Sequence, residues 1–386
     1  MYLGPFATMA DRFAVAPLLI PISVSLHVSL AAASGAASLY YLAYGVFPAG
    51  YGMLADRYGR VRIMRVALAG TAVADLLSSF SPNLVFLLIA RFVTGALACG
   101  VLPTVLVYVG DRFAFRVRQA AVANVQTFVA MGTAVGTLGA GLTAHFLSWR
   151  IFFFFPGAAA ALLAIFLGRV PESLSNRSTQ NPLAQVALVL RNRWSLLVLG
   201  LGILVGAVMF GFVTFLAPSL EANGESAAVA GTVVASYGLS VLLCSRLLHL
   251  VARVVSVPLI LAGGAALLLL GYVAASVAQS LLVILLTSVL AGAAYAFMQS
   301  TFQTWATDVV PEARATSTAL FASTIFAGAA LATATVAGLA AAHQYSTLFL
   351  IAALVTLPVL IAGSIGRWRY PGSEILDDPQ RGSQIG

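Results

Sequence analysis

The sequence has no lysine, and charged residues of every kind are scarce in it. They make up 8% of the 386 residues, whereas apolar residues make up 61%. An average soluble domain carries about 25% charged residues, which it needs to cover its surface. This composition excludes an ordinary soluble protein and predicts an all-α integral membrane protein. The missing lysine also excludes a phosphate-binding P-loop and any lysine Schiff base.

Reactive and metal-binding groups are sparse as well. The two cysteines, Cys99 and Cys244, lie in apolar segments far apart in the chain, so no disulfide framework is expected. No histidine has a second ligand nearby, so we predict neither a metal site nor a cofactor. The HExxH and GxSxG motifs of hydrolases are absent, and we therefore do not expect an enzyme.

Twelve stretches of the chain are long and apolar enough to cross a bilayer, for which a helix needs about 20 residues. They lie near residues 5–27, 34–55, 63–81, 84–110, 119–145, 151–169, 195–218, 227–249, 255–277, 280–306, 315–342 and 346–366. Most connecting turns are short and carry glycine, proline, serine or asparagine, which end helices.

The arginines separate onto one side of this predicted bundle. Seventeen of the twenty fall in the loops after even-numbered spans or in the C-terminal tail, and Arg150 lies in an opposite loop. Arg12 and Arg91 lie inside spans. Because arginine-rich loops stay in the cytoplasm, both termini are predicted to be cytoplasmic.

The most polar interior segment divides the chain into two parts. Residues 1–170 and 195–366 each hold six spans and are expected to form two bundles. Residues 171–194 are expected to form a cytoplasmic linker with an interfacial helix, and residues 367–386 a polar cytoplasmic tail.

The segment GMLADRYGRVR, residues 52–62, lies between two predicted spans. Its charges cannot lie in lipid, so it must form an aqueous loop. The spacing G-x-L-x-D-R-x-G-R resembles the loop between the second and third helices of major facilitator superfamily (MFS) transporters. An eroded copy from Ser245 follows it after 193 residues and keeps the leucine and the final arginine. The resemblance covers essentially the whole chain.

This resemblance implies twelve helices in two pseudo-symmetric six-helix bundles, with a cavity near the middle of the membrane and secondary active transport by alternating access. The implied partners are a small-molecule substrate, protons and the lipid bilayer, without nucleic acid. We expect a monomer in the plasma membrane, which is the inner membrane of a bacterium. A cavity with few charges suits a neutral or weakly cationic solute.

The loop motif is predicted to act as a conformational latch. In the resembled family, its acid docks on the N-terminal end of helix 11, where helix amides favour a carboxylate; here that helix would start near Pro311. The latch residues carried over are Gly52, Leu54, Asp56, Arg57, Gly59 and Arg60, with Asp111 as the acid that pairs with the loop arginines. The alternative is that these charges only set the topology.

Charges within the predicted spans are the candidates for proton coupling. Arg91 resembles the arginine of the family's helix-4 motif R-x-x-x-G, which is implicated in proton transfer or substrate binding; alternatively it snorkels to the interface. Asp11 is a candidate proton carrier because burial penalises the charged form of a carboxylate, although it could instead pair with Arg12. Asp75 lies on a helix that is peripheral in the family, so we expect less of it.

Further polar and small residues complete the predicted site. Tyr295, Gln299 and Gln303 recur at helical spacing on a span that lines the cavity in the resembled family. In span 5, the segment GTAVGTLGAG resembles the antiporter signature G-x-x-x-G-P-x-x-G-G. Its matching glycines are Gly132, Gly136 and Gly141, whereas Thr137 replaces the proline.

The glycine motif favours proton-coupled efflux of a small organic or amphipathic compound. Its missing proline leaves open a proton symporter or facilitator that takes up a small metabolite. A lipid flippase is the alternative from a different class.

Overall fold

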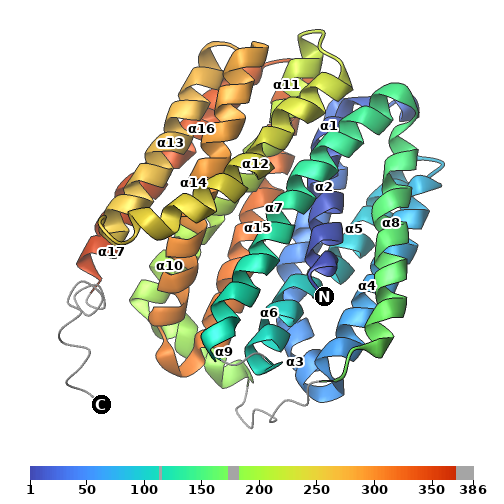
Figure 1. Cartoon of the computed structure of the whole chain (residues 1–386). Helices are drawn as coiled ribbons and strands as arrows, with labels where there is room; N and C mark the ends of the chain where they lie inside the picture. The colour runs from blue at the N-terminus through green and yellow to red at the C-terminus, as the bar shows by residue number, and fades with distance from the viewer. Residues whose placement is uncertain (113–114, 173–181, 371–386) are drawn as a thin grey trace.

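The computed structural model describes residues 1–112, 115–172 and 182–370, and all regular elements within these ranges are helices (Figure 1). The first half contains α1 (Leu3–Leu26), α2 (Leu30–Val46), α3 (Pro48–Tyr58), α4 (Arg60–Ser79), α5 (Leu84–Ala98), α6 (Val101–Arg112), α7 (Phe115–Phe146), α8 (Trp149–Phe166) and the turn η1 (Leu167–Arg169). The helix α9 (Pro182–Arg191) follows.

The second half contains α10 (Arg193–Gly206), η2 (Ala207–Gly211), η3 (Phe212–Phe215), α11 (Leu216–Ala222), α12 (Ala227–Val251), α13 (Val257–Val277), α14 (Leu281–Asp308), η4 (Pro311–Ala313), α15 (Arg314–Ala341), α16 (Tyr345–Pro358), η5 (Val359–Gly363) and α17 (Ser364–Arg369). In Figure 1 the helices run side by side, with α4 and α8 on one flank and α13 and α16 on the other.

Ten stretches of the described residues are long and apolar enough to cross a membrane. The two other predicted spans, 34–55 and 63–81, are also helical. The first is split into α2 and α3 at Phe47, ahead of a proline, and the second is α4, whose first two turns carry arginines. The fold is therefore a polytopic helical bundle, while the count of twelve stays a prediction.

The loops gather at two ends of the bundle. At one end, Arg150 donates to the Ser25 hydroxyl at 3.0 Å and to the Ser81 carbonyl at 3.1 Å. At the other end, Arg60 forms an ion pair with Asp111 at 2.8 Å. We call this second end the arginine-rich end. That it faces the cytoplasm remains a prediction from the positive-inside rule.

The helices of the second half repeat those of the first at a spacing of 197 residues. α12 begins 197 residues after α2 (227 − 30), α13 after α4 (257 − 60) and α14 after α5 (281 − 84). The capping serines Ser29 and Ser226 obey the same spacing, and each accepts a backbone N–H three residues further on. The 193-residue register read from the loop motif is wrong, because helix starts and caps carry the repeat and the loop copy is eroded.

The two halves meet along a seam made mainly by four helices. α2 packs on α15, and α7 packs on α12. The rings of Tyr44 and Phe326 lie 4.3 Å apart across this seam. Near the end opposite the arginine-rich end, a side chain on Gly141 would collide with the carbonyl of Ala227. Close backbone contact thus holds the halves together at that end.

Candidate functional site

The central feature of the first half is an arginine shared by two carboxylates. Arg91 on α5 donates from both terminal nitrogens to Asp11 on α1, at 2.6 and 3.0 Å. Its Nη1 also lies 3.4 Å from Asp75 on α4. All three side chains are 0% exposed. We call these three residues the acidic cluster; it joins three helices inside the membrane.

The surroundings of the acidic cluster are aromatic. The guanidinium carbon of Arg91 lies 4.7 Å from the ring centroid of Tyr40 and 4.8 Å from that of Phe153. Thr94 donates to one oxygen of Asp75 at 3.3 Å, while the other carboxylate oxygen of Asp75 is buried without a hydrogen-bond partner. Arg91 therefore neither snorkels to an interface nor leaves Asp11 free to pair with Arg12.

The second half makes the corresponding connection without charge. The positions 197 residues after Asp11 and Asp75 are Val208 and Tyr272. The Tyr272 hydroxyl donates to the Val208 carbonyl. A neutral hydrogen bond thus joins the same pair of helices in the second half, so the fold alone does not require charged residues here.

Arg12 follows Asp11 on α1 but lies at the seam, and it is 5% exposed. Its guanidinium carbon lies 5.1–5.4 Å from the ring centroids of four aromatic residues. These are Phe13 and Tyr44 of the first half and Phe210 and Phe326 of the second. We call these four residues the aromatic cage.

A cavity of about 10 Å³, barely the room for one water molecule, adjoins Arg12. It is lined by Arg12, Phe13, Val129, Ala130, Thr133, Tyr237, Val241 and Tyr295. Of the predicted substrate residues, Tyr295 thus lies beside Arg12. Gln299 donates to Gln303 at 3.3 Å further along α14, where Gln303 is exposed. The structure therefore separates the predicted stripe into a buried tyrosine and two glutamines nearer the arginine-rich end.

The loop motif lies at the arginine-rich end, where Arg60 and Asp111 form the ion pair described above. Gly59 adopts a φ of +97°, which favours glycine, in the tight turn between α3 and α4. Gly52, Leu54 and Arg57 are exposed on α3. The side chain of Asp56 lies outside the described residues, so its predicted docking on α15 stays a prediction.

Sequence reasoning missed Glu172, which follows the last span of the first half. Its carboxylate accepts the backbone N–H of Val61 at 2.8 Å and that of Arg62 at 3.1 Å. These amides belong to the first turn of α4, where a carboxylate also favours the helix dipole. Glu172 therefore ties the segment after α8 to the loop motif.

The span-5 glycines are contact points between helices. Side chains on Gly132 and Gly136 would collide with the carbonyls of Phe6 and Ala10 on α1, whereas Gly141 faces α12 across the seam. The Thr137 hydroxyl donates to the Thr133 carbonyl at 2.6 Å, and α7 continues unbroken where the antiporter signature has proline. These glycines allow close packing within the first half and across the seam.

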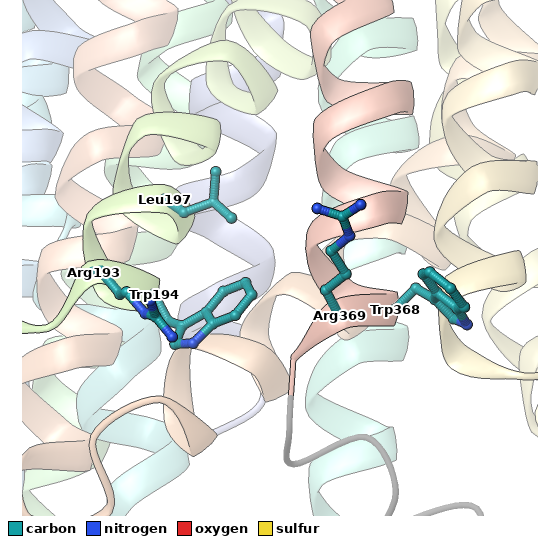
Figure 2. A pocket seen from close by; sticks show the side chains of 5 residues that line it. All are labelled: Arg193, Trp194, Leu197, Trp368 and Arg369. Atoms are coloured by element: carbon teal, nitrogen blue, oxygen red, sulfur yellow. The ribbon is translucent and has the colours of Figure 1, made fainter.

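A second hollow, with a volume of about 700 Å³, lies at the arginine-rich end between α10 and α17. Figure 2 shows Arg193, Trp194 and Leu197 on one helix, with Trp368 and Arg369 on the other. Trp368 is 70% exposed. Arginine and tryptophan together are typical of the membrane–water interface, so this hollow belongs to the periphery and not to the seam.

Comparison with known sequences gives the family. A sequence profile described as Major Facilitator Superfamily matches residues 1–333 and 220–384. The chain is 30% identical over 123 residues to the niacin transporter NiaP of Acinetobacter baylyi, covering 32% of this chain and 28% of that protein. It is 28% identical over 200 residues to the quinolone resistance protein NorB of Staphylococcus aureus, covering 50% and 42%. The matched regions span less than half the length of these relatives.

Solved structures share the whole fold. The nucleoside transporter NupG superposes with a TM-score of 0.72 at 16% identity, covering 96% of this chain and 99% of that one. A D-xylose–proton symporter superposes with a TM-score of 0.74 at 16% identity, covering 96% and 97%. These identities support likeness of fold alone. Since the family profile extends over nearly the whole chain, the chain belongs to the Major Facilitator Superfamily, a family of membrane transporters and not of enzymes.

Proposed function

We propose that this protein is a secondary active transporter that moves a small organic solute by alternating access, coupled to protons, in a bacterial inner membrane. The observation that carries this proposal is the acidic cluster, in which one buried arginine serves two buried carboxylates. The family and the two-half fold support transport in general, and the cluster supports the coupling to protons.

Charge counting gives the reason. With both carboxylates ionised, the acidic cluster carries one net negative charge in a site that water does not reach. Burying an uncompensated charge is costly, so uptake of one proton would leave the cluster neutral and relieve that cost. Asp75 has a carboxylate oxygen without a partner, which offers a position for this proton. The uncharged connection in the second half argues that the fold can do without these charges.

The acidic cluster also has a route to the seam. The Tyr40 ring covers Arg91 and stacks on Tyr44 at 5.8 Å, and both tyrosines belong to α2. α2 packs on α15 of the second half, where Tyr44 contacts Phe326. A change of charge at Arg91 would therefore be felt by the helix that holds the halves together. We infer that protonation shifts the balance between the two orientations of the halves.

The seam is closed around Arg12, because the adjoining cavity of about 10 Å³ could hold no organic solute. Entry of a solute would require the halves to part, as alternating access demands. A cavity this small also favours a small solute over a lipid, so we rank the flippase below a solute transporter.

We propose efflux in exchange for protons as the direction, since the glycines of the antiporter signature are present and NorB is named for resistance to quinolones. Uptake is the second candidate. It is favoured by the unbroken course of α7 at Thr137, and the relative NiaP is named as a niacin transporter.

The test uses purified protein in liposomes under a pH gradient of either sign. The probes are labelled nicotinate and the quinolone norfloxacin, chosen from the names of the two relatives. One proton moving through 100 mV supplies about 2.3 kcal/mol, enough for a roughly fifty-fold gradient. We expect accumulation of a probe on the acidic side for an antiporter and on the alkaline side for a symporter.

The matched control is Asp308→Asn, which removes a carboxylate from a more exposed ion pair at the arginine-rich end, 3.8 Å from Arg367. It should leave the gradient-driven accumulation unchanged. Transport that runs equally fast in both pH gradients and in their absence would refute proton coupling and leave a facilitator.

A further inference from the structure

Arg12 is a buried cation that no carboxylate neutralises within the part of the chain that the structure describes. The buried arginines Arg60, Arg91 and Arg367 each form an ion pair with an acid. Arg12 instead contacts the aromatic cage and the sulfur of Met9, 2.7 Å from its Nη2, and its Nε is buried without a partner. Because a buried charge is costly without a partner of opposite sign, this arrangement lacks an anion.

The aromatic cage draws equally on the two halves. Phe13 and Phe210 occupy positions 197 residues apart, which correspond under the internal repeat, and each ring centroid lies 5.1 Å from the guanidinium carbon of Arg12. Phe210 belongs to η2, a π-helical turn, and such turns are frequent at functional sites. A molecule held at Arg12 would therefore touch both halves at once.

A second polar group faces the same space. Tyr237 lines the cavity beside Arg12, and its hydroxyl is buried without a hydrogen-bond partner. Thr133 also lines the cavity, but its hydroxyl already donates to the Val129 carbonyl at 3.0 Å. The cavity thus offers one arginine and one free phenol hydroxyl, both able to donate to an oxygen anion.

We propose that Arg12 recognises an organic monoanion, namely a carboxylate attached to a flat aromatic body, with Tyr237 as a second donor. This inference rests on the proposed transport function and names its substrate class. One guanidinium matches one carboxylate, whereas a phosphate dianion would call for more basic residues. Aromatic rings above and below favour a flat apolar body. Composition alone favoured a neutral or weakly cationic solute, but the position of Arg12 opposes a cation.

Equilibrium binding to the purified full-length protein tests this without any pH gradient. The probes are benzoate, cinnamate, 2-hydroxybenzoate and indole-3-carboxylate, each beside its neutral amide, with benzylamine as the cation. Binding is read from the rise in unfolding temperature with ligand concentration. At least one acid should bind roughly ten-fold more tightly than its amide, the effect of one charge-assisted hydrogen bond. Benzylamine should give no rise.

Variants locate the site. Arg12→Gln should remove the preference for acid over amide, Arg12→Lys should keep part of it, and Tyr237→Phe should weaken binding of the acid several-fold while keeping the ring. The control Arg253→Gln removes an exposed arginine and should bind as the wild type does. If Arg12→Gln fails to fold, Arg12→Lys and Tyr237→Phe decide.

The proposal is overturned if every acid binds no better than its amide, if benzylamine binds best, or if Tyr237→Phe and both Arg12 variants bind the acid as the wild type does. These outcomes are separate from failure of the proposed function. A protein that accumulates a probe under a pH gradient but shows no preference for acids would lose the anion site and keep its proton coupling.

Discussion

Asp11 and Arg12 are consecutive residues of α1, yet they serve two different sites. The Asp11 carboxylate binds Arg91 inside the first half, while the Arg12 guanidinium lies in the aromatic cage at the seam. Neighbouring residues on a helix point about 100° apart, which allows this separation. A single peptide unit therefore connects the proposed proton site to the proposed anion site, and a movement of α1 at one reaches the other directly.

Neutralising either carboxylate of the acidic cluster should uncouple transport from protons. In Asp11→Asn the cluster loses its excess negative charge permanently, so it has no reason to take up and release a proton. We expect proton-driven accumulation to be lost, while exchange of labelled for unlabelled solute across the membrane continues. Asp75→Asn should behave in the same way.

The measurement is accumulation and exchange of the same probe in parallel liposomes, with Asp308→Asn as the control carboxylate. If Asp11→Asn keeps the pH dependence of the wild type, Asp11 has no part in the coupling. If Asp75→Asn alone keeps it, the proton belongs to Asp11.

Removing the arginine should destabilise the protein much more than removing one acid. Arg91→Gln would leave two carboxylates buried without a cation, and breaking a buried ion pair in this way costs about 3–5 kcal/mol. Adding Asp11→Asn to Arg91→Gln removes one of the stranded charges and should restore part of the loss. The unfolding temperatures of the wild type and of the single and double variants in detergent give the coupling.

Arg253→Gln, at an exposed position, is the control for loss of an arginine. Equal unfolding temperatures for Arg91→Gln and Arg253→Gln would contradict the buried cluster itself. A double variant no more stable than Arg91→Gln would show that Asp11 contributes through something other than its charge.

Much of the fold could be predicted because apolar lengths and turn residues act locally. The turn before Leu84 ends one span and starts another, and α5 begins at that residue. The breaks within spans could not be predicted. α5 and α6 separate near Gly100, where a side chain would collide with the ring of Tyr51, a residue far away in sequence. Such kinks depend on packing that the local sequence does not encode.

The site was predictable only as isolated charges. Asp11 and Arg91 stand out because a charge in an apolar segment is rare, but nothing in the sequence pairs residues 80 positions apart. Asp75 carried the same signal and was undervalued, because its helix was assigned to the periphery. Glu172 gave no signal, since an acid just after a span is common in any aqueous loop.

The latch remains the prediction most directly open to mutation. Asp56→Asn should reduce transport by several-fold or more without preventing insertion, because an amide loses the charge that a helix N-terminus favours. The assay is probe transport per molecule of protein found in the membrane. Glu225→Gln, at the opposite end of the bundle, should have no effect. Normal turnover in Asp56→Asn would leave the loop motif as a topology signal only.

Two glycines of α7 should separate stability from conformational balance. Ala at position 136 would meet the backbone of Ala10 on α1, within the first half, and overpacking of this kind typically costs about 1–3 kcal/mol. Gly136→Ala should therefore lower the unfolding temperature. Gly141 instead faces Ala227 and Gly231 across the seam, so Gly141→Ala should weaken closure of the end opposite the arginine-rich end while sparing stability.

Spin labels on cysteines at Phe146 and Ala228 report that closure, after Cys99 and Cys244 are replaced by serine. We expect a larger population of long distances in Gly141→Ala than in the parent protein. Gly263→Ala and Gly338→Ala are the controls, because a side chain at either position has no atom within 4 Å. If Gly141→Ala lowers the unfolding temperature as much as Gly136→Ala and leaves the distances unchanged, the seam is a fixed interface, and the two halves do not separate there during transport.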